Sequence, residues 1–352
     1  MVWRKINKQV EFWETPVLGT KNLKDGKRFM ALCVDPSSKY PYRGIARQVL
    51  ERIGNEDIPG YLDRSKLVIV ESYDLLNWKV ICDLQINGIK KIIDKLIGKE
   101  KEFIGLEDPD IIINKDNKKH LYFTIPFKYH TKSINDVDRY DVHIGHAEGF
   151  NLENLKATMP VLGKINKTIT GFKEICPIPL NKGKNKLILC ETFVNKGKEK
   201  KYSAIGLSKV KSISKKWNYV KLVHDPLIEI HNWCKGYSSP CRIFNPDFLN
   251  HKGYLVGIMN GREPTKKLNK KLFYGKFRPG LFLFDINSEK IVWIDENPLL
   301  EDPVATTITF GSDLVYLNKK EAILFAHPND SFVRAYKLNL EKIKERLSKI
   351  SI

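Results

Sequence analysis

The sequence repeats one short phrase, a proline followed by two aliphatic residues: Thr15-Pro16-Val17-Leu18-Gly19, Met159-Pro160-Val161-Leu162-Gly163, Asp225-Pro226-Leu227-Ile228-Glu229 and Asn297-Pro298-Leu299-Leu300-Glu301. Successive prolines of the phrase lie 144, 66 and 72 residues apart. Because the first gap is twice the last, we expect a degenerate copy near Gly88. The spacing therefore predicts five modules of about 70 residues each, the last of which runs to the C-terminus.

Within each module, short stretches of aromatic and β-branched residues alternate with polar turns. The second module shows this order in Asp110–Ile113, His120–Ile125 and Val142–His146. Such spacing is typical of strands joined by tight turns, and four strands repeated five times are typical of a propeller. The sequence therefore predicts an all-β fold, a five-bladed β-propeller formed by a single domain over residues 1–352. A β-sandwich is the alternative, but it does not account for the repeated proline phrase.

The five expected blades cover residues 20–85, 100–158, 170–224, 235–296 and 303–340. Helical periodicity is confined to two places outside the regular strand pattern. Leu340–Ile350 predicts a short C-terminal helix, and Ile45–Ile53 predicts a second one inside a long insertion at residues 37–65.

The composition is that of a folded protein, with 42% hydrophobic and 11% aromatic residues. No run of about 18 apolar residues is present, so we expect no membrane span. The early charges argue against a secretory signal, so a cytoplasmic protein is expected. The six cysteines include no C-x-x-C pair, which favours reduced, buried thiols over disulfides or a zinc site.

The formal net charge is +19, which raises the question of a nucleic-acid partner. The lysines are spread through nearly every turn, a pattern typical of solvated hairpin tips. No nucleic-acid motif accompanies them. We therefore expect no nucleic-acid partner, while an anionic substrate or an anionic cell surface stays open.

The first strand of each propeller blade lines the central channel, so its acidic residues are candidates for catalysis. Carboxylates that converge on one channel repel one another, which is unfavourable unless they have a function. Glycoside hydrolysis is such a function, since one carboxylic acid protonates the leaving oxygen and one carboxylate activates water. The alternative is that each acidic residue caps a turn before a proline. Three successive first segments contain such a residue: Asp35 in Ala31–Pro36, Asp108 in Gly105–Asp110 and Glu174 in Phe172–Pro177.

The first segments of the last two modules are Tyr237–Arg242 and Ala305–Thr309, neither of which has a carboxylate. Metal ligation is not expected, because no metal-ligand cluster is apparent. His143 and His146 are three residues apart on one expected strand and therefore point to opposite faces. His327, in Ala326-His327-Pro328, is a single candidate without an expected partner.

One segment of the second module carries a resemblance to a known family. Gly105-Leu106-Glu107-Asp108-Pro109-Asp110, followed by Leu121–Thr124, resembles the G-x-E-D-P-R signature of the five-bladed mannosyl phosphorylases of glycoside hydrolase family 130. The phrase Asp74–Trp78 resembles one that families 32, 43 and 130 share. The resemblance covers nearly the whole chain, and further similarity to the last two blades of family 130 lies in Gly280–Asp285, Asn297–Leu300, Ile323–Ala326 and Val333–Tyr336.

The resemblance implies roles for the three carboxylates. By analogy with family 130, Asp108 is the general acid. By analogy with families 43 and 32, Asp35 is the base, Asp108 the pKa modulator or transition-state stabiliser, and Glu174 the acid. Two positions depart from the family 130 pattern: Asp110 stands where that family has arginine, and Lys173-Glu174 replaces Lys-Asp. An anion in place of a cation is unfavourable near phosphate.

The sequence therefore predicts a glycoside hydrolase that cleaves an oligosaccharide by inversion, without a cofactor. The alternatives are an inverting phosphorylase that uses inorganic phosphate and a non-catalytic carbohydrate-binding propeller. A propeller scaffold that binds partners or nucleic acid through its basic surface is a further alternative. Besides Asp35, Asp108 and Glu174, the candidates for substrate binding are Glu107, Arg43, Trp233, Arg242 and Arg278.

Overall fold

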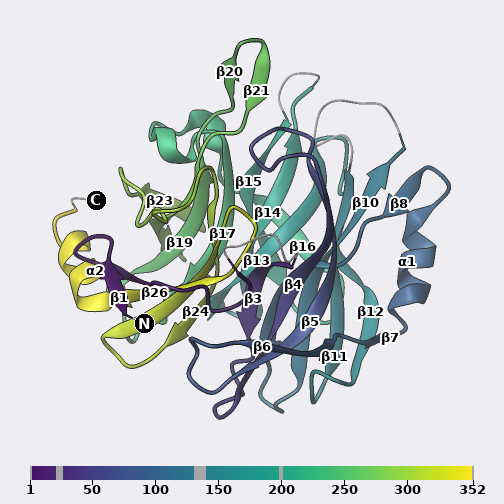
Figure 1. Ribbon diagram of the computed structural model, residues 1–352, viewed down its shortest axis with the longest axis horizontal. Helices are drawn as coiled ribbons and strands as arrows, with labels where there is room; N and C mark the ends of the chain where they lie inside the picture. The colour runs from purple at the N-terminus through teal and green to yellow at the C-terminus, as the bar shows by residue number, and fades with distance from the viewer. Residues whose placement is uncertain (1, 21–26, 131–139, 198–200, 351–352) are drawn as a thin grey trace.

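The computed structural model describes residues 2–20, 27–130, 140–197 and 201–350. The fold is all-β, as predicted, and Figure 1 shows strands throughout with two α-helices at its edges. The C-terminal helix α2 (Leu340–Leu347) is confirmed. Its first turn is capped by Asn339, whose side-chain oxygen accepts the Lys342 N–H at 2.9 Å. Among the described residues, no helix is long and apolar enough to cross a bilayer.

The first set of strands runs antiparallel in chain order: β3 (Arg28–Val34), β4 (Tyr42–Ile53), β5 (Leu62–Ser72) and β6 (Lys79–Asp83). The helix predicted over Ile45–Ile53 is wrong, because this segment belongs to β4. Its residues pair on both sides, as Ile45 does with Cys33 of β3 and Ile69 of β5. These two ladders bind both edges of the segment's backbone and outweigh its local helical pattern.

Two further sets form one continuous sheet. They meet at a single parallel pair, Val142 with Gly171. Short strands β7 (Ile86–Asn87) and β8 (Lys101–Phe103) join its edges. The first of the two sets contains β9 (Glu107–Ile113), β10 (Lys119–Tyr129), β11 (Tyr140–Gly149) and β12 (Leu155–Leu162), and the second contains β13 (Ile169–Lys182), β14 (Asn185–Asn195), β15 (Lys201–Val210) and β16 (Asn218–His224).

The fourth set gains one short strand, and a hairpin within its sequence forms a separate two-stranded sheet. The hairpin of β20 (Lys266–Leu268) and β21 (Lys271–Phe273) stands out from the body in Figure 1. Two 3₁₀ turns, Pro226–Ile228 and Asn232–Cys234, precede the set. Its strands are β17 (Tyr237–Ile243), β19 (Tyr254–Arg262), β22 (Phe277–Asp285) and β23 (Lys290–Ile294), with β18 (Asn250–His251) paired to β19.

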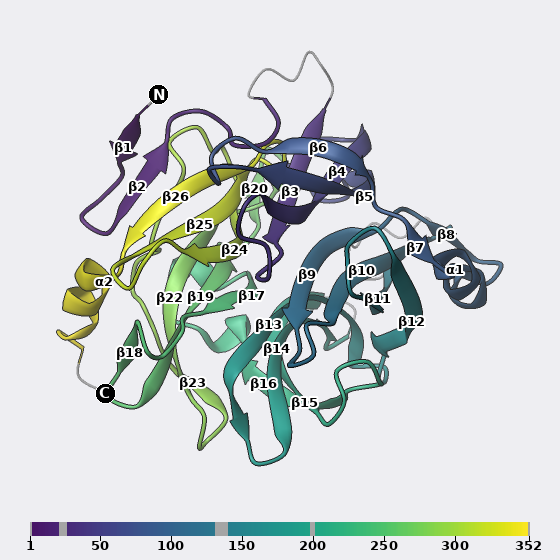
Figure 2. The same cartoon turned by 90° about the horizontal axis from the view of Figure 1, so that it is seen from below.

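The last set is completed by the N-terminus of the chain. β24 (Thr309–Tyr316), β25 (Glu321–Pro328) and β26 (Arg334–Asn339) are followed in the sheet by β2 (Val10–Trp13) and β1 (Trp3–Lys5). We expected this module to end with C-terminal residues alone, and its first strand to begin near Ala305 rather than at Thr309. Figure 2 shows the sets arranged around a common centre, with β1 and β2 beside the yellow C-terminal strands.

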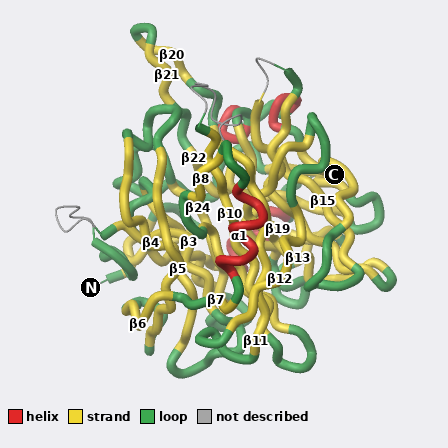
Figure 3. The backbone as a smooth tube through the Cα atoms, turned by 90° about the vertical axis from the view of Figure 1, so that its right-hand side faces the viewer, coloured by secondary structure: helices red, strands yellow, loops and turns green. Residues whose placement is uncertain are grey.

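The proline phrase holds the end of a module in place. The backbone N–H of Trp78 donates to the Val17 carbonyl, and the backbone N–H of Trp217 donates to the Val161 carbonyl, both at 2.9 Å. The fifth copy expected near Gly88 is replaced by helix α1 (Ile89–Ile97), which begins after Gly88 at φ 81°. Figure 3 shows α1 lying across the outside of the strands. Its amphipathic spacing is a signal that our reading of the sequence missed.

Candidate active site

The first strand of every set has a shift in register where it pairs with its neighbour. The shifts lie between Met30 and Cys33 in β3, Glu107 and Asp110 in β9, Lys173 and Ile175 in β13, Pro240 and Arg242 in β17, and Gly311 and Asp313 in β24. Such bulges re-aim side chains. Ala31, Asp108 and Glu174 lie inside the first three and have positive φ values of 49°, 48° and 38°. These three residues therefore occupy equivalent positions.

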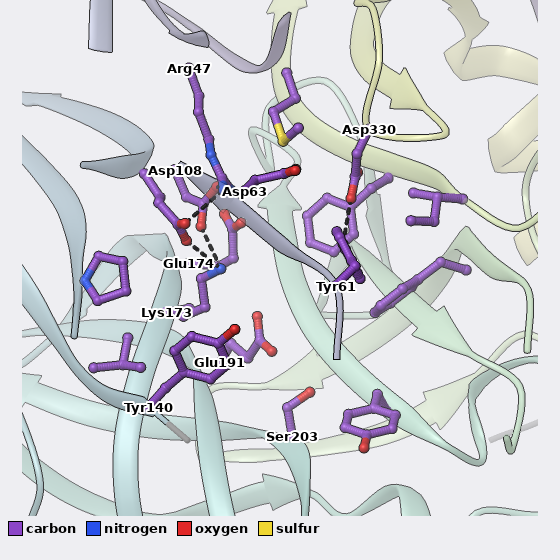
Figure 4. Close-up of a pocket in the computed structure, with 18 of the residues that line it drawn as sticks. Arg47, Tyr61, Asp63, Asp108, Tyr140, Lys173, Glu174, Glu191, Ser203 and Asp330 are labelled. Atoms are coloured by element: carbon purple, nitrogen blue, oxygen red, sulfur yellow. Dashed lines mark hydrogen bonds and ion pairs between the residues drawn. The ribbon is translucent and has the colours of Figure 1, made fainter. Parts of the chain in front are cut away.

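The bulges surround a cavity of about 250 Å³. Its walls include residues of all five first strands: Met30, Glu107, Glu174, Tyr237 and Phe310. Figure 4 shows Asp108, Lys173 and Glu174 on one side of this pocket and Tyr61 and Asp330 on the other. The pocket therefore lies where the sets of strands meet.

Two cations and two carboxylates form a closed cluster in the pocket wall. Arg47, on β4, contacts Glu107 at 2.6 Å and Asp108 at 3.1 Å. The Lys173 ammonium contacts each of the same two carboxylates at 2.9 Å. The side chains of Arg47, Glu107 and Asp108 are at most 8% exposed. Ion pairs removed from water in this way hold their partners rigidly, because breaking one leaves a buried charge uncompensated.

Asp108 and Glu174 have opposite protonation preferences. Burial raises the pKa of Asp108, but the Lys173 ammonium and the Arg47 guanidinium outweigh it, so the net pKa lies below its usual value. Burial and then the neighbouring Asp108 carboxylate hold the pKa of Glu174 well above its usual value. Of this pair, Asp108 therefore favours the ionised form and Glu174 the protonated form, the combination that acid–base chemistry needs.

The far side of the pocket has a second polar group. Asp330 accepts a hydrogen bond from the Tyr61 hydroxyl at 2.8 Å and lies 3.3 Å from His327 Nε2. The other ring nitrogen of His327 accepts the backbone N–H of Ala31 at 3.2 Å. This contact holds the bulge of β3 and leaves Nε2 to carry the imidazole proton toward Asp330.

Aromatic rings and an arginine form another part of the wall. The Arg262 guanidinium lies 3.5 Å from the ring centre of Tyr274 and 5.0 Å from that of Phe277. Tyr237 completes this group at 5.6 Å. Such flat apolar faces beside polar groups suit the alternating faces and hydroxyls of a sugar.

The predicted position of Asp35 is wrong. This residue follows β3 at the end of the strand away from Met30 and is not among the described residues that line the pocket. Its carboxylate contacts the Lys119 ammonium at 2.8 Å and accepts from the N–H and hydroxyl of Ser37 at 2.9 and 2.7 Å. The turn-capping alternative therefore describes Asp35, and Ala31 is the residue of β3 that matches Asp108 and Glu174.

Four of the five substrate-binding candidates also lie outside the described pocket lining, and only Glu107 is within it. Arg43 pairs with Glu153, and Arg278 pairs with Glu263 and Glu301. Trp233 is 3% exposed and donates its indole N–H to the Asp295 carbonyl at 2.9 Å. This tryptophan packs in the core between strands, so it has no free face for a sugar.

Arg242 is the first paired residue after the bulge of β17 and is not among the described residues that line the pocket. Its guanidinium contacts Asp110 at 2.7 Å and Asp313 at 2.8 Å. These three residues hold the equivalent position after their bulges in β17, β9 and β24. Asp110 stands where the family signature has arginine, and its negative charge is therefore balanced by Arg242 within the protein.

Several pocket residues were missed by the sequence reasoning. They are Arg47, Tyr61, Asp63, Glu191 and Asp330. Glu191 is paired in register with Lys173 across the β13–β14 hairpin, so a correct hairpin register would have located it. Burial raises its pKa, against hydrogen bonds from Ser203 and Ser239. Asp63 is held by Arg52 through two contacts of 2.7 Å.

Comparison with known proteins finds relatives in structure only. No family model and no curated protein sequence matches the chain. A β-1,2-mannobiose phosphorylase from Listeria innocua, in complex with β-1,2-mannobiose, superposes with a TM-score of 0.64 at 11% identity, over 96% of this chain and 99% of that one. The chain shares the fold of these enzymes.

Two further solved structures extend the likeness. One represents glycoside hydrolases within family 130 of mannoside phosphorylases, which target β-1,2 mannosidic linkages in Candida mannan; its TM-score is 0.63 at 13% identity, over 97% of this chain and 91% of that one. The other is a mannose phosphorylase from Leishmania mexicana in complex with phosphate, with a TM-score of 0.56 at 15% identity, over 93% and 88% of the two chains. The resemblance to family 130 expected from the Glu-Asp-Pro segment is thus confirmed for the fold.

Proposed function

We propose that this chain is a five-bladed β-propeller glycosidase that cleaves an oligosaccharide with inversion in its central pocket. Support for five blades comes from the five antiparallel sets of strands, each of which contributes its first strand to the pocket wall. The N-terminal strands complete the last set, a common way to close a ring and remove its open edges.

The observation that carries the proposal is that Asp108 and Glu174 lie at equivalent bulge positions in one pocket, with pKa values shifted in opposite directions. Glu174 donates its proton to the glycosidic oxygen as the bond to the anomeric carbon breaks. Water attacks that carbon and transfers a proton to the Asp108 carboxylate. Proton return from Asp108 to Glu174 through solvent restores the starting state. Asp108 thus takes the base role that the resemblance to families 43 and 32 gave to Asp35.

A β-1,2-linked mannoside is the proposed substrate, by analogy with the compounds bound or targeted by the structural neighbours. The cavity of about 250 Å³ is smaller than the roughly 300–1,000 Å³ of pockets for drug-sized ligands, which favours one or two sugar rings. Hydrogen-bond acceptors for sugar hydroxyls come from Asp63, Glu191 and Asp330 around its wall.

Water is favoured over phosphate as the acceptor. Phosphate binds best to arginine and lysine side chains that are not already neutralised. In this pocket Arg47 and Lys173 each contact both Glu107 and Asp108. The alternative, an inverting phosphorylase, is favoured by the phosphate complex of the Leishmania mexicana neighbour.

The test is product formation from β-1,2-mannobiose with and without inorganic phosphate. We expect mannose to be released at equal rates in both, and Asp108→Asn to lower kcat by about 10²–10⁴-fold. Asp35→Asn is the matched control, since that carboxylate lies outside the pocket and its loss should leave kcat within a few-fold.

Other outcomes separate the alternatives. Release of mannose 1-phosphate that depends on phosphate would establish the phosphorylase. Binding of the disaccharide without any product would establish the non-catalytic propeller. Full activity in Asp108→Asn contradicts the proposed site, provided that circular dichroism shows the variant folded like the parent protein.

A further inference from the structure

A second cluster of potential ligand groups lies on β10 and β11, away from the pocket. His120 is six residues before Pro126, the β10 residue that reaches the pocket wall. Six residues of strand span about 20 Å. His120 and His146 are buried, at 3% and 0% exposed, and Glu148 is half-buried. No step proposed for the pocket uses these side chains.

The register of the two strands brings the three groups together. His120 is directly opposite Glu148, and His146 precedes Glu148 by two residues, which places both on the same face of β11. His120 Nδ1 lies 3.0 Å from His146 Nε2 and 3.5 Å from Glu148 Oε2. The three ligand atoms lie within 4.8 Å of one another.

We propose that His120, His146 and Glu148 form a binding site for a zinc-class divalent cation. Zinc is bound by imidazole nitrogen and carboxylate oxygen at about 2.0–2.2 Å in a tetrahedral arrangement. Tetrahedral bonds of that length separate neighbouring donor atoms by about 3.3–3.6 Å. The observed separation of 3.5 Å lies within this range, and that of 3.0 Å is slightly shorter. A small movement of the two rings therefore suffices to accept the ion, with water as a fourth ligand.

The outer atoms of all three side chains are already held. His146 Nδ1 contacts the Thr158 hydroxyl at 2.8 Å, His120 Nε2 contacts the Asn114 amide at 3.2 Å, and Glu148 Oε1 contacts the Lys118 ammonium at 2.7 Å. Bound metals are commonly supported in this way, by partners that orient the ligands from behind. The inner atoms His120 Nδ1, His146 Nε2 and Glu148 Oε2 face one another. A neutral imidazole with its lone pair directed at the ion is the form that binds a metal.

A metal-free chain of hydrogen bonds is the competing account of these contacts. In it, His120 Nδ1–H donates to His146 Nε2, and Asn114 donates to His120 Nε2. Metal binding needs His120 to move its proton from Nδ1 to Nε2, with no net release, and the Asn114 amide to turn by half a rotation. The Lys118 N–H, which Asn114 Oδ1 now accepts at 3.1 Å, keeps Asp116 Oδ1 as an acceptor at 3.2 Å. The Asn114 NH2 group then faces the Lys118 N–H instead of an acceptor, and because Asn114 is only half-buried, solvent is left to accept from it.

The experiment is a titration of untagged, EDTA-stripped protein with Zn²⁺, followed by calorimetry and by thermal unfolding. We expect one ion per chain and a higher unfolding temperature in Zn²⁺. Co²⁺ in place of Zn²⁺ should give the visible absorption of a tetrahedral complex. Glu148→Gln and His146→Gln should each weaken binding by at least about 10-fold, the size of loss typical for metal-site changes.

Two controls make the result decisive. His231→Gln alters another histidine beside a glutamate, with His231 Nε2 3.9 Å from Glu229, and should leave binding unchanged. Cys82→Ser removes the exposed thiol and should also leave it unchanged. Zinc binding that persists in Glu148→Gln and disappears in Cys82→Ser overturns the proposal, as does the absence of binding. If His146→Gln does not fold, Glu148→Gln alone tests the site, because Glu148 is only half-buried and its replacement should not prevent folding.

Discussion

Asp108 and Glu174 occupy the same bulge position in neighbouring first strands, with φ values of 48° and 38°. Backbone in this region is strained for residues other than glycine and is enriched at functional sites. Their surroundings differ. Asp108 contacts Lys173 and Arg47, whereas the environment of Glu174 is dominated by burial and by the charge of Asp108. The cations therefore decide which carboxyl group is ionised.

This difference predicts how the two variants respond to the leaving group. Glu174→Gln should lower kcat on β-1,2-mannobiose by about 10²–10⁴-fold. It should stay near the parent rate on a dinitrophenyl β-mannoside, whose leaving group needs no proton. Asp108→Asn should lose activity on both substrates, because no carboxylate remains to activate water. Measured kcat/KM for both substrates in both variants checks the assignment, and the reverse pattern would make Asp108 the acid.

The pH profile adds an independent readout of the same residue. The proposed mechanism needs Glu174 protonated, so the rate of the parent protein should fall as the pH rises through the raised pKa of that group. Glu174→Gln has no proton to lose, and its residual rate on β-1,2-mannobiose should lack this alkaline limb. An unchanged alkaline limb in Glu174→Gln shows that another group supplies the proton.

At the scale of the strands, the positions that follow the bulges bring charged residues of three sets together. Asp110, Arg242 and Asp313 occupy it in three of the five sets, and two ion pairs join them. Burial raises the pKa of Asp110 to about 6, against the effect of Arg242. Two carboxylates therefore share one arginine.

The free energy of unfolding should therefore depend on pH through Asp110. The folded pKa of Asp110 is about 6, above the unfolded value of about 3.9, so its stabilising contribution is complete below pH 4 and is lost as the pH rises through 6. Two pKa units correspond to about 3 kcal/mol. Relative to the parent, Asp110→Asn should therefore gain up to about 3 kcal/mol in unfolding free energy between pH 4 and pH 7. Urea unfolding of both proteins across this range measures the difference, which should be constant if Asp110 does not titrate.

The contrasting variant is Arg242→Met. It leaves the Asp110 and Asp313 carboxylates without their shared cation and should cost about 3–5 kcal/mol at pH 7. The cost should shrink at pH 5, where Asp110 takes up a proton. A variant as stable as the parent at pH 7 would show that the arginine does not hold the channel together.

Element types were mostly predictable from the sequence, but their exact alignment was not. Strand composition and the proline phrase predicted the all-β class, and the Glu-Asp-Pro segment located Asp108 and Glu107. Asp35 was misplaced because Asp35-Pro36 and Asp108-Pro109 look alike, whereas the bulges align Ala31 with Asp108. A bulge depends on pairing with the next strand, which one segment alone does not reveal. Asp63 and Asp330 reach the pocket through tertiary packing and have no local signal, whereas locating Glu191 needed only the register of the β13–β14 hairpin.

At the scale of the whole molecule, the two ends of the chain lie in one sheet. Val10, Glu11 and Phe12 pair with Leu338, Lys337 and Tyr336 of β26. Val10 is 1% exposed within a core cluster, and the Phe12 ring lies 5.1 Å from the guanidinium of the fully buried Arg334. The Asn7 side chain also donates to the Leu299 carbonyl, in the last proline phrase, at 2.8 Å. The N-terminal strands thus cover the edge of β26 and a buried ion pair of Arg334 with Asp302.

Deleting residues 2–13 should therefore destabilise the entire fold rather than one end. Burial of Val10 contributes about 1.5–3 kcal/mol, and each lost ladder hydrogen bond adds about 1 kcal/mol. The sum is on the order of 5 kcal/mol, comparable to the total stability of many domains. The truncated protein should have a much lower urea midpoint, or be insoluble because the edge of β26 is open.

Replacing the projecting residues 266–272 by two glycines is the control, since these residues are exposed and their loss should leave the midpoint unchanged. Equal midpoints for the truncated and full-length proteins would mean that the sheet does not depend on its N-terminal strands.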